Sequence, residues 1–402
     1  MRDFVFSIRY SPKIFALKTN LYFAGFASVS TLGSTSDEVW DAYQNPRAFF
    51  KRQQFSEKEY WLSSISETAK LEVAELQKEK KAYSYLDRSV LLALLATRKL
   101  AKNLSESSRL TFQNAGINIG SSRGATELLE QHHQEFLKTG KVSSQTSPTT
   151  TLGNLSSWVA QDLGSTGAVF SHSITCSTAL HGVLNAAAWL SSGMATSFIV
   201  GGTEAPLTPF TIAQLEALKL YTTIKDKMAC QSLAFNKQSN TLVLGEAASV
   251  FALSTQPENA VAQLNGMGYA NEQIKHSIAI SSDAKCFQKA MKMALVQANL
   301  IQVDAIIMHA PGTIKGDEAE LNAVQKVFSK TPYLTTNKWK IGHTYAASGA
   351  MSLEMGILML QHQECIPNPF YKNTETPTEI NHIMVNAVGF GGNAVSLIVS
   401  KI

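Results

Sequence analysis

The sequence predicts an α/β fold. Apolar runs of strand length alternate with helix-length segments along the whole of the 402 residues, and this alternation favours helices packed on largely parallel sheets. The chain is longer than one hydrophobic core usually supports, so we expect two domains or one large double-layered domain. A hydrophobic content of 45% with 16% charged residues is typical of a globular protein with a large interior.

The first part of the chain supplies strands and helices in turn. An apolar run predicts a strand at 21–29, and the segment rich in Glu, Lys and Ala at 64–81 is typical of a solvated helical face. Asp87 begins a predicted helix at 88–102, whose leucines indicate burial on most sides. A short strand ending in glycine follows at 117–120.

The middle of the chain contains a predicted loop, a strand and a tightly packed helix. The stretch at 142–157 is rich in Ser and Thr, which predicts a loop. The apolar run at 167–170 predicts a buried strand. The small residues at 183–190 predict a close-packed helix that ends near Gly193.

The second half repeats this pattern. We expect a buried strand at 305–308, a helix at 321–328 that begins after Asp317, and final strands at 384–388 and 396–399. These elements again alternate as in an α/β fold.

A break around Pro257 is the best candidate boundary between two similar halves, 20–255 and 256–402. Residues 1–19 are interrupted by Arg9, Pro12 and Lys13 and lack a continuous signal-peptide core, so we interpret them as an N-terminal extension.

Charge and cysteine content exclude several classes of function. A net charge of +4 gives little support to nucleic-acid binding. The four cysteines form no CxxC pair, which argues against a disulfide framework or a structural zinc site and suits the reducing cytoplasm. No apolar run approaches the roughly 18–20 residues that a membrane span needs.

Cys176 lies at the predicted junction between the strand at 167–170 and the helix at 183–190. The unpaired amides and the dipole of a helix N-terminus favour a thiolate, so Cys176 is a candidate nucleophile. A buried structural cysteine is the alternative interpretation. Two histidines far downstream favour the nucleophile.

His309 and His343 each lie in a short motif. His309 begins the segment HAPGTIKGD, which ends at Asp317, and His343 ends the segment KWKIGH, which begins at Lys338. Either histidine alone is weak evidence, because a histidine at a strand end is often a satisfied polar residue. The order and spacing of the whole set make the signal specific.

With these motifs the chain resembles the β-ketoacyl-acyl carrier protein synthases (ketosynthases), the condensing enzymes of the thiolase superfamily. The resemblance covers roughly residues 20–402. It rests on the cysteine elbow around Cys176, the HGTGTxxGD element at 309–317, the KxxxGH element at 338–343 and part of the GFGGTNA element at 389–393. Supporting matches are Leu32-Gly33, Asp87-Arg88, the GGTE segment at 201–204 and the LGE segment at 244–246.

The resemblance implies a fold of two similar βαβαβαββ halves packed as five layers, αβαβα, with the cysteine in the first half and both histidines in the second. It implies a dimer that pairs through a first-half strand, either with itself or with a related ketosynthase-like subunit. It also implies an acyl carrier protein as partner, whose phosphopantetheine arm carries the substrates. No metal or other cofactor is implied.

The resemblance assigns catalytic roles to Cys176, His309, Lys338 and His343. Cys176 would hold the acyl chain as a thioester. The two histidines would act on the malonyl unit and stabilise the enolate left by decarboxylation, and Lys338 would support the histidine site. The backbone amides of Cys176 and Phe390 would form the oxyanion hole, and the Phe390 side chain would gate access to the acylated cysteine.

Four further residues receive supporting roles from the resemblance. Thr313 and Gly391 would contact the pantetheine arm, and Glu246 and Asp317 would give structural support.

Several positions depart from the family pattern while leaving the Cys–His–His set intact. We expect these departures to bear on carrier-protein preference and acyl specificity rather than on the reaction. They are Ile174 before the elbow, Ala310 and Pro311 after His309, Trp339 and Lys340 after Lys338, Leu215 in place of a gating phenylalanine, Ser352 in place of a buried glutamate with Glu354 two positions further on, and Asn393 directly after Gly392.

The leading functional hypothesis is a discrete elongating ketosynthase, an acyltransferase of a specialised pathway that makes a polyketide, an aryl polyene or a resorcinol-type lipid. Two histidines favour an elongating over an initiating synthase, and the absence of a cysteine at 389–392 disfavours a thiolase proper. Ordinary fatty-acid elongation is one alternative. The other is a non-catalytic, chain-length-determining partner subunit, although such subunits usually lose the cysteine that this chain keeps.

Overall fold

The computed structural model describes residues 19–402 except 56, 108–111 and 274–279. All but the last residue of the expected extension at 1–19 lies outside the described residues. Within the described part of the chain, no helix is both long and apolar enough to cross a bilayer.

A ten-stranded sheet contains five strands from each half of the chain, in the order β11-β10-β12-β13-β9-β1-β8-β6-β4-β5. The two halves meet where β1 pairs with β9, with Leu21 opposite Leu264. The strands are β1 (Leu21–Val29), β4 (Gly116–Gly120), β5 (Val169–Phe170), β6 (Ser197–Glu204), β8 (Ala247–Ser254), β9 (Ala262–Ala270), β10 (Ala305–Ile307), β11 (Tyr333–Thr335), β12 (His382–Gly389) and β13 (Asn393–Ser400).

The strands of this sheet are mixed in direction, so the expectation of largely parallel sheets is wrong. Pairs at the two outer ends are parallel, as in β4–β6 and β10–β12. Pairs around the middle, such as β1–β8, β6–β8, β9–β13 and β12–β13, are antiparallel. A short connection explains one of these pairs, because the antiparallel neighbours β12 and β13 need only a tight turn.

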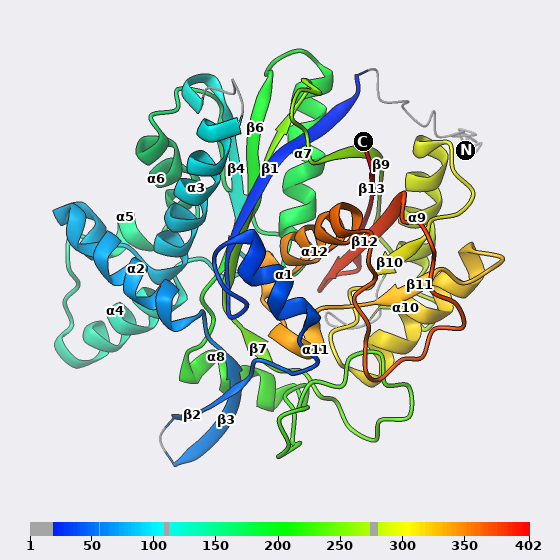
Figure 1. Cartoon of the computed structure of the whole chain (residues 1–402). Helices are drawn as coiled ribbons and strands as arrows, with labels where there is room; N and C mark the ends of the chain where they lie inside the picture. The colour runs from blue at the N-terminus through cyan, green and yellow to red at the C-terminus, as the bar shows by residue number, and fades with distance from the viewer. Residues whose placement is uncertain (1–18, 56, 108–111, 274–279) are drawn as a thin grey trace, which may run out of the picture.

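A smaller sheet projects from the base of the molecule (Figure 1). It pairs β2 (Lys51–Phe55) with β3 (Lys58–Ser63) in antiparallel fashion, and β3 with β7 (Leu244–Gly245) in parallel.

The helices and the two five-stranded parts of the sheet form five layers, αβαβα, as the resemblance implied (Figure 1). The central layer contains α7 (Thr178–Ser191) and α12 (Ser348–His362), which contact strands of both halves. The first outer layer contains α2 (Glu67–Glu79), α3 (Arg88–Ser107) and α6 (Asn154–Leu163), and the second contains α9 (Lys285–Ala298) and α10 (Ile314–Val327). The remaining helices are α1 (Ser36–Gln44), α4 (Thr126–Thr139), α5 (Thr146–Thr150), α8 (Pro209–Ala217) and α11 (Lys338–Ile341), with 3₁₀ turns at Lys81–Tyr85, Phe112–Asn114 and Tyr345–Ala347.

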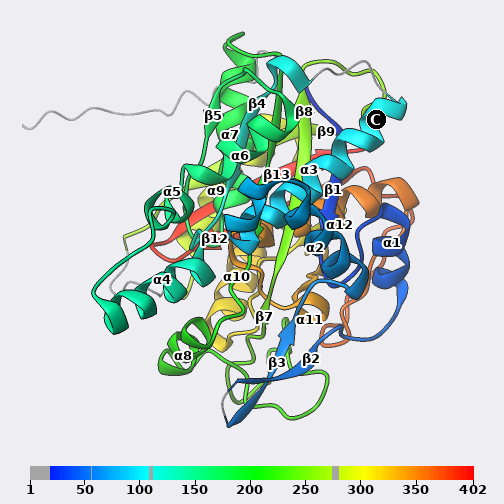
Figure 2. The ribbon, with the colours of Figure 1, turned by 90° about the vertical axis from the view of Figure 1, so that its left-hand side faces the viewer.

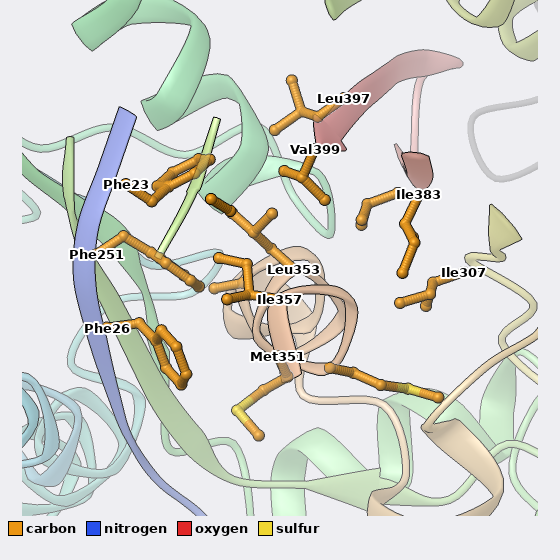
Figure 3. Packing of buried hydrophobic residues seen from close by; sticks show 14 of the residues in the cluster. Phe23, Phe26, Phe251, Ile307, Met351, Leu353, Ile357, Ile383, Leu397 and Val399 are labelled. Carbon is orange, nitrogen blue, oxygen red and sulfur yellow. The ribbon is translucent and has the colours of Figure 1, made fainter. Parts of the chain in front are cut away.

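The core around α12 shows why the halves pack as one unit (Figure 3). Met351, Leu353 and Ile357 of α12 lie between apolar side chains of both sheet parts. On one side are Phe23, Phe26 and Phe251, and on the other Ile307, Ile383, Leu397 and Val399. A helix that is apolar on all sides is stable only in such a fully buried layer.

The predicted loop at 142–157 is wrong in part, since it contains α5 and the start of α6. Threonine side chains make the helical turns possible: Thr149 and Thr150 donate to the carbonyl oxygens four residues earlier. Such back-bonding satisfies hydroxyls that would otherwise compete with the helix. Helices α7 and α10 also begin earlier than predicted, at Thr178 and Ile314.

Candidate active site

The elbow that carries Cys176 is a strained turn between β5 and α7. Thr175 has a positive φ of 47°, which is costly for a β-branched residue. The Thr178 hydroxyl holds the turn in place, since it accepts the Ile174 N–H at 2.8 Å and donates to the Thr175 carbonyl at 2.6 Å. The sharp turn presents Cys176 directly before α7.

Apolar side chains surround the Cys176 thiol, which is only 5% exposed. Burial raises the pKa of this thiol to about 12, against the opposing charge of Lys338. The resting group is therefore a thiol, because desolvation opposes the thiolate that the helix N-terminus favours. The surrounding side chains are Leu62, Ile212, Leu215, Leu242, Leu244 and Tyr345.

His309 follows β10 and is buried at 4% exposure. Its backbone N–H donates to Oε1 of Glu320 at 2.9 Å, while its Nδ1 has no hydrogen-bond partner. Burial and the nearby Lys338 charge hold the pKa of the imidazole well below its usual value, so the ring is neutral.

His343 lies across from His309, with ring centroids 5.2 Å apart in an edge-to-face arrangement. Its backbone N–H donates to the Val243 carbonyl at 2.7 Å, which fixes it beside β7. Burial and Lys338 hold its pKa well below the usual range. Because Nδ1 accepts the Tyr345 N–H at 3.1 Å, the proton of the neutral ring is on Nε2, which makes that nitrogen a hydrogen-bond donor.

Lys338 is a buried cation behind the two histidines. It is 1% exposed and its Nζ has no hydrogen-bond partner. Burial lowers its pKa, while the nearby carboxyl of Glu320 and the Cys176 thiol act in the opposite direction. Its charge therefore acts on the cysteine and on both imidazoles.

Glu320 is the counter-group of Lys338, and the sequence interpretation missed it. Its two oxygens accept the N–H groups of His309 and Ala310, each at 2.9 Å, and Asn386 donates to it at 3.1 Å. Burial raises its pKa. The missing signal was its spacing, because Glu320 is three residues after Asp317 and therefore lies on the same buried face of α10.

The turn between β12 and β13 packs against the cysteine elbow. Gly391 and Gly392 adopt positive φ values of 93° and 74°, which glycine tolerates. A Cβ atom at Gly389 would lie 2.7 Å from the Ile174 carbonyl oxygen, so only glycine allows this approach. Phe390, with 39% of its surface exposed, directly follows this glycine and is therefore part of the turn that packs against the elbow.

The predicted supporting residues lie near the site in different positions. The Thr313 hydroxyl caps α10 by accepting the Gly316 N–H at 3.2 Å. The O–H of this hydroxyl can still donate a hydrogen bond of its own. Asp317 forms a buried ion pair with Lys237 at 2.6 Å and accepts the Gly312 N–H at 3.0 Å.

Glu246 lies away from the thiol and pairs with Arg88 through contacts of 2.7 and 2.8 Å. It also accepts the Ile65 N–H at 3.1 Å, so these contacts join the start of α3 to the strand after β7. Glu204 forms a second such link: it accepts the N–H groups of Ser122 and Ala346 at 2.7 and 3.1 Å.

The structure explains one departure from the family pattern. The Lys340 ammonium donates to the carbonyl oxygens of Ala42 and Asn45 at the end of α1 and lies 4.4 Å from the Trp339 ring centroid. A cation at a helix C-terminus is favourable. Lys340 thus fastens α11, which carries Lys338, to α1.

Two other departures alter buried positions. Leu215 packs in the apolar cluster around Cys176. Ser352 and Glu354 both lie in the buried layer of α12, where the Ser352 Oγ has no partner and burial raises the pKa of Glu354 to about 8. Glu354 is therefore a neutral acid at neutral pH.

Comparison with known proteins agrees with this geometry. The family model described as "Beta-ketoacyl synthase, N-terminal domain" matches residues 26–259, and the one described as "Beta-ketoacyl synthase, C-terminal domain" matches residues 261–372. A 3-oxoacyl-[acyl-carrier-protein] synthase 2 of Coxiella burnetii is 25% identical over 412 aligned positions, which cover 96% of this chain and 99% of that protein.

Solved structures share the fold at lower identity. A β-ketoacyl synthase from Burkholderia phymatum has a TM-score of 0.83 at 20% identity, covering 96% of this chain and 100% of the other. A ketosynthase in complex with its chain length factor from Xenorhabdus doucetiae has a TM-score of 0.81 at 21% identity, covering 96% and 98%. Since the two family models together span most of the chain, this protein belongs to the β-ketoacyl synthase family of acyltransferases.

Proposed function

We propose that this chain catalyses the decarboxylative Claisen condensation of an acyl group held on Cys176 with a malonyl unit carried by an acyl carrier protein. The observation that carries the proposal is the pair of neutral, buried imidazoles of His309 and His343, whose ring centroids are 5.2 Å apart. They lie beside the buried Lys338, whose charge also acts on Cys176. A buried nucleophile next to neutral donors suits this chemistry.

In the first step the Cys176 sulfur attacks the thioester carbonyl of the acyl carrier protein. The new C–S bond forms as the bond to pantetheine sulfur breaks, and the thiol proton of Cys176 passes to the departing pantetheine sulfur. The backbone amides of Cys176 and Phe390 stabilise the oxyanion of the tetrahedral intermediate. The Lys338 charge favours the transient thiolate.

In the second step the malonyl unit loses its carboxylate. The C–C bond to that carboxylate breaks, carbon dioxide leaves, and the electron pair moves into the thioester enolate. The Nε2–H of His343 donates to the enolate oxygen, and His309 donates a ring N–H to the same oxygen. Neutral donors stabilise the developing charge in a buried site that water does not reach.

In the third step the enolate carbon attacks the acyl thioester on Cys176. Collapse of the tetrahedral intermediate breaks the C–S bond and releases a β-ketoacyl group on the carrier protein. The bond's electron pair stays on the Cys176 sulfur, which takes up a proton from solvent to restore the thiol. The apolar cluster around the cysteine favours an acyl chain over water in this position.

We further propose that the catalytic unit is a dimer of this chain with itself or with a related subunit, and that it needs no cofactor beyond the phosphopantetheine arm of the carrier protein. The Xenorhabdus doucetiae ketosynthase is a complex with a chain length factor, which supports a heterodimer as one arrangement. The retained Cys176 favours the catalytic over the non-catalytic subunit.

Intact-mass measurement tests the proposal. The chain is incubated with acyl carrier protein thioesters, alone and with a co-expressed partner, and then with malonyl carrier protein. We expect one acyl adduct that disappears in Cys176→Ala and persists in Cys230→Ala, a control at another buried cysteine. Malonyl carrier protein should then remove the adduct. Condensation by Cys176→Ala would contradict the proposal, and a chain that is never acylated would favour the non-catalytic subunit.

A further inference from the structure

A large cleft adjoins the apolar cluster around Cys176. It has a volume of 1410 Å³ and is lined by residues of β2, α4 and α8. Both views of the ribbon place α8 between α4 and the β2–β3 hairpin (Figures 1 and 2). Phe55 and Leu207 line the cleft and also pack against the apolar cluster that contains Cys176. These two side chains therefore stand at the boundary between the cleft and the apolar cluster that contains Cys176.

The cleft is separate from the residues assigned to the pantetheine arm. Neither Thr313, Phe390 nor Gly391 is among its lining residues. A group bound there therefore lies outside the residues predicted to contact the carrier arm.

Arg123 lines this cleft with unused hydrogen-bonding capacity. Its Nη2 donates to Oε1 of Gln214 at 2.6 Å, while its Nε is buried without a partner. Within the described part of the chain, no carboxylate lies in ion-pair distance of this guanidinium. An unpaired donor in a buried position is costly, so the arrangement calls for an acceptor oxygen from a ligand.

Arg123 is also close to the reacting cysteine. Its backbone N–H donates to Glu204, which also accepts the Ala346 N–H directly after Tyr345. Burial raises the pKa of the Tyr345 phenol, Cys176 adds to that rise, and the Arg123 charge opposes it. Tyr345 is therefore close to both the thiol and the guanidinium.

The charges in the cleft favour a neutral acceptor. Arg88 is already paired with Glu246, whereas Glu127 and Glu130 line the same wall as Arg123. Burial raises the pKa of Glu127, and Thr208 donates to Glu130 at 2.6 Å. A carboxylate-terminated chain would meet these acidic groups, but a ketone would not be repelled.

We propose that Arg123, held by Gln214, is a specificity-determining residue that recognises a carbonyl oxygen within the acyl chain, so that the cleft selects oxo-acyl over fully reduced acyl groups. This inference rests on the proposed function, since it assumes that Cys176 carries the acyl chain. The inference extends the proposed function by naming the chemical class of the acyl chain.

The test measures the rate of Cys176 acylation by intact mass. The substrates are eight-carbon acyl pantetheine thioesters of three kinds. One is saturated, one is a series with a single ketone at successive positions along the chain, and one ends in a carboxylate. We expect Arg123→Met to lower acylation by the best oxo-acyl substrate about tenfold, the loss of a hydrogen bond to a charged group, and to leave the saturated chain nearly unchanged. Gln214→Leu should give a smaller loss of the same selectivity.

Lys70→Met is the matched control, because Lys70 lines the same cleft but pairs with Glu67 at 3.0 Å. It should leave the selectivity unchanged. Equal losses for oxo-acyl and saturated chains in Arg123→Met, or no loss for either, would overturn the inference. If Arg123→Met does not fold, Gln214→Leu decides by the same criterion.

Two further results would also overturn the assignment. One is faster acylation by the carboxylate-terminated chain than by any ketone. The other is an Arg123→Met effect that appears only with phosphopantetheine thioesters, since Arg123 would then bind the phosphate. A wild-type chain that no thioester acylates would instead contradict the proposed function itself, so the two failures are distinguishable.

Discussion

The two sides of the active site differ in how they use burial. The first half of the chain surrounds Cys176 with apolar side chains, whereas the second half places His309, His343, Lys338 and Glu320 together with almost no exposed surface. On the cysteine side, burial raises the thiol pKa. On the histidine side, it lowers the imidazole pKa values. The thiol and the two imidazoles are neutral at rest for the same reason, because a low dielectric penalises their charged forms.

The difference teaches how the tasks are divided. The cysteine side offers space for an apolar chain and one nucleophile, while the histidine side keeps fixed donors around a balanced Lys338–Glu320 pair. A preorganised polar site stabilises developing charge without reorganising during the reaction.

The largest expected effect comes from His343→Gln. The change removes the placed Nε2–H donor, so we expect malonyl decarboxylation to fall about 100–1000-fold. Acylation of Cys176 should change little, because it depends on the other side. Separate assays of carbon dioxide release and of the acyl adduct check this, and an equal loss in both would mean that the two sides are not separable.

The link between the sides is tested by Lys340→Met. The side chain of Lys340 bonds the end of α1 and anchors the helix that carries Lys338. Losing hydrogen bonds from a charged donor should reduce the free energy of unfolding by about 2 kcal/mol, measured by urea denaturation. Lys51→Met, which breaks an exposed pair with Glu67, is the control and should change little. Unaltered stability in Lys340→Met would show that the anchor is not needed.

The charge balance of the histidine side is tested by Glu320→Gln. The carboxyl of Glu320 opposes the lowering of the Lys338 pKa, so its removal should lower that pKa further. We expect decarboxylation to fall about tenfold and the alkaline limb of its pH profile to move to lower pH. A simple loss of rate with an unmoved limb would indicate a purely structural role.

The last prediction concerns Glu354, which lies in the central layer away from both sides. Burial raises its pKa from 4.5 to about 8, so between these values the unfolded chain releases a proton that the folded chain keeps. Stability is therefore lost as the pH rises through this window, by at most about 1.4 kcal/mol per pH unit. Glu354→Gln removes this dependence. Thermal unfolding should show an advantage of the variant that grows with pH, and a constant difference would contradict the assignment.

Several features of the fold and the site followed from local patterns. The strand at 21–29 matches β1 from Leu21 to Val29, and the motif at 309–317 does lie at the end of β10. These predictions hold because an apolar period and a glycine or polar stop are local signals. Helix α3 extends five residues beyond its predicted end, to Ser107, since polar residues on a partly exposed helix do not end it.

Other features depend on contacts between distant segments. Glu320 and Arg123 carried no motif, yet one contacts the His309 backbone and the other approaches Tyr345 through Glu204. The Lys340 anchor joins residues nearly three hundred positions apart. No local pattern reports such pairs, because their partners are brought together only by packing of the two halves.

The sequence by itself determined the family and was enough to propose the nucleophile, the two histidines and Lys338, since each lies in a short motif whose spacing is a local property of the chain. Only the tertiary structure decided the protonation states, the mixed direction of the strands and the cleft beside Cys176. Burial sets the protonation states, and strand pairing sets the directions of the strands. The cleft forms where β2, α4 and α8 meet. All three depend on which surfaces exclude water once the chain has folded, and that is a property of the whole molecule.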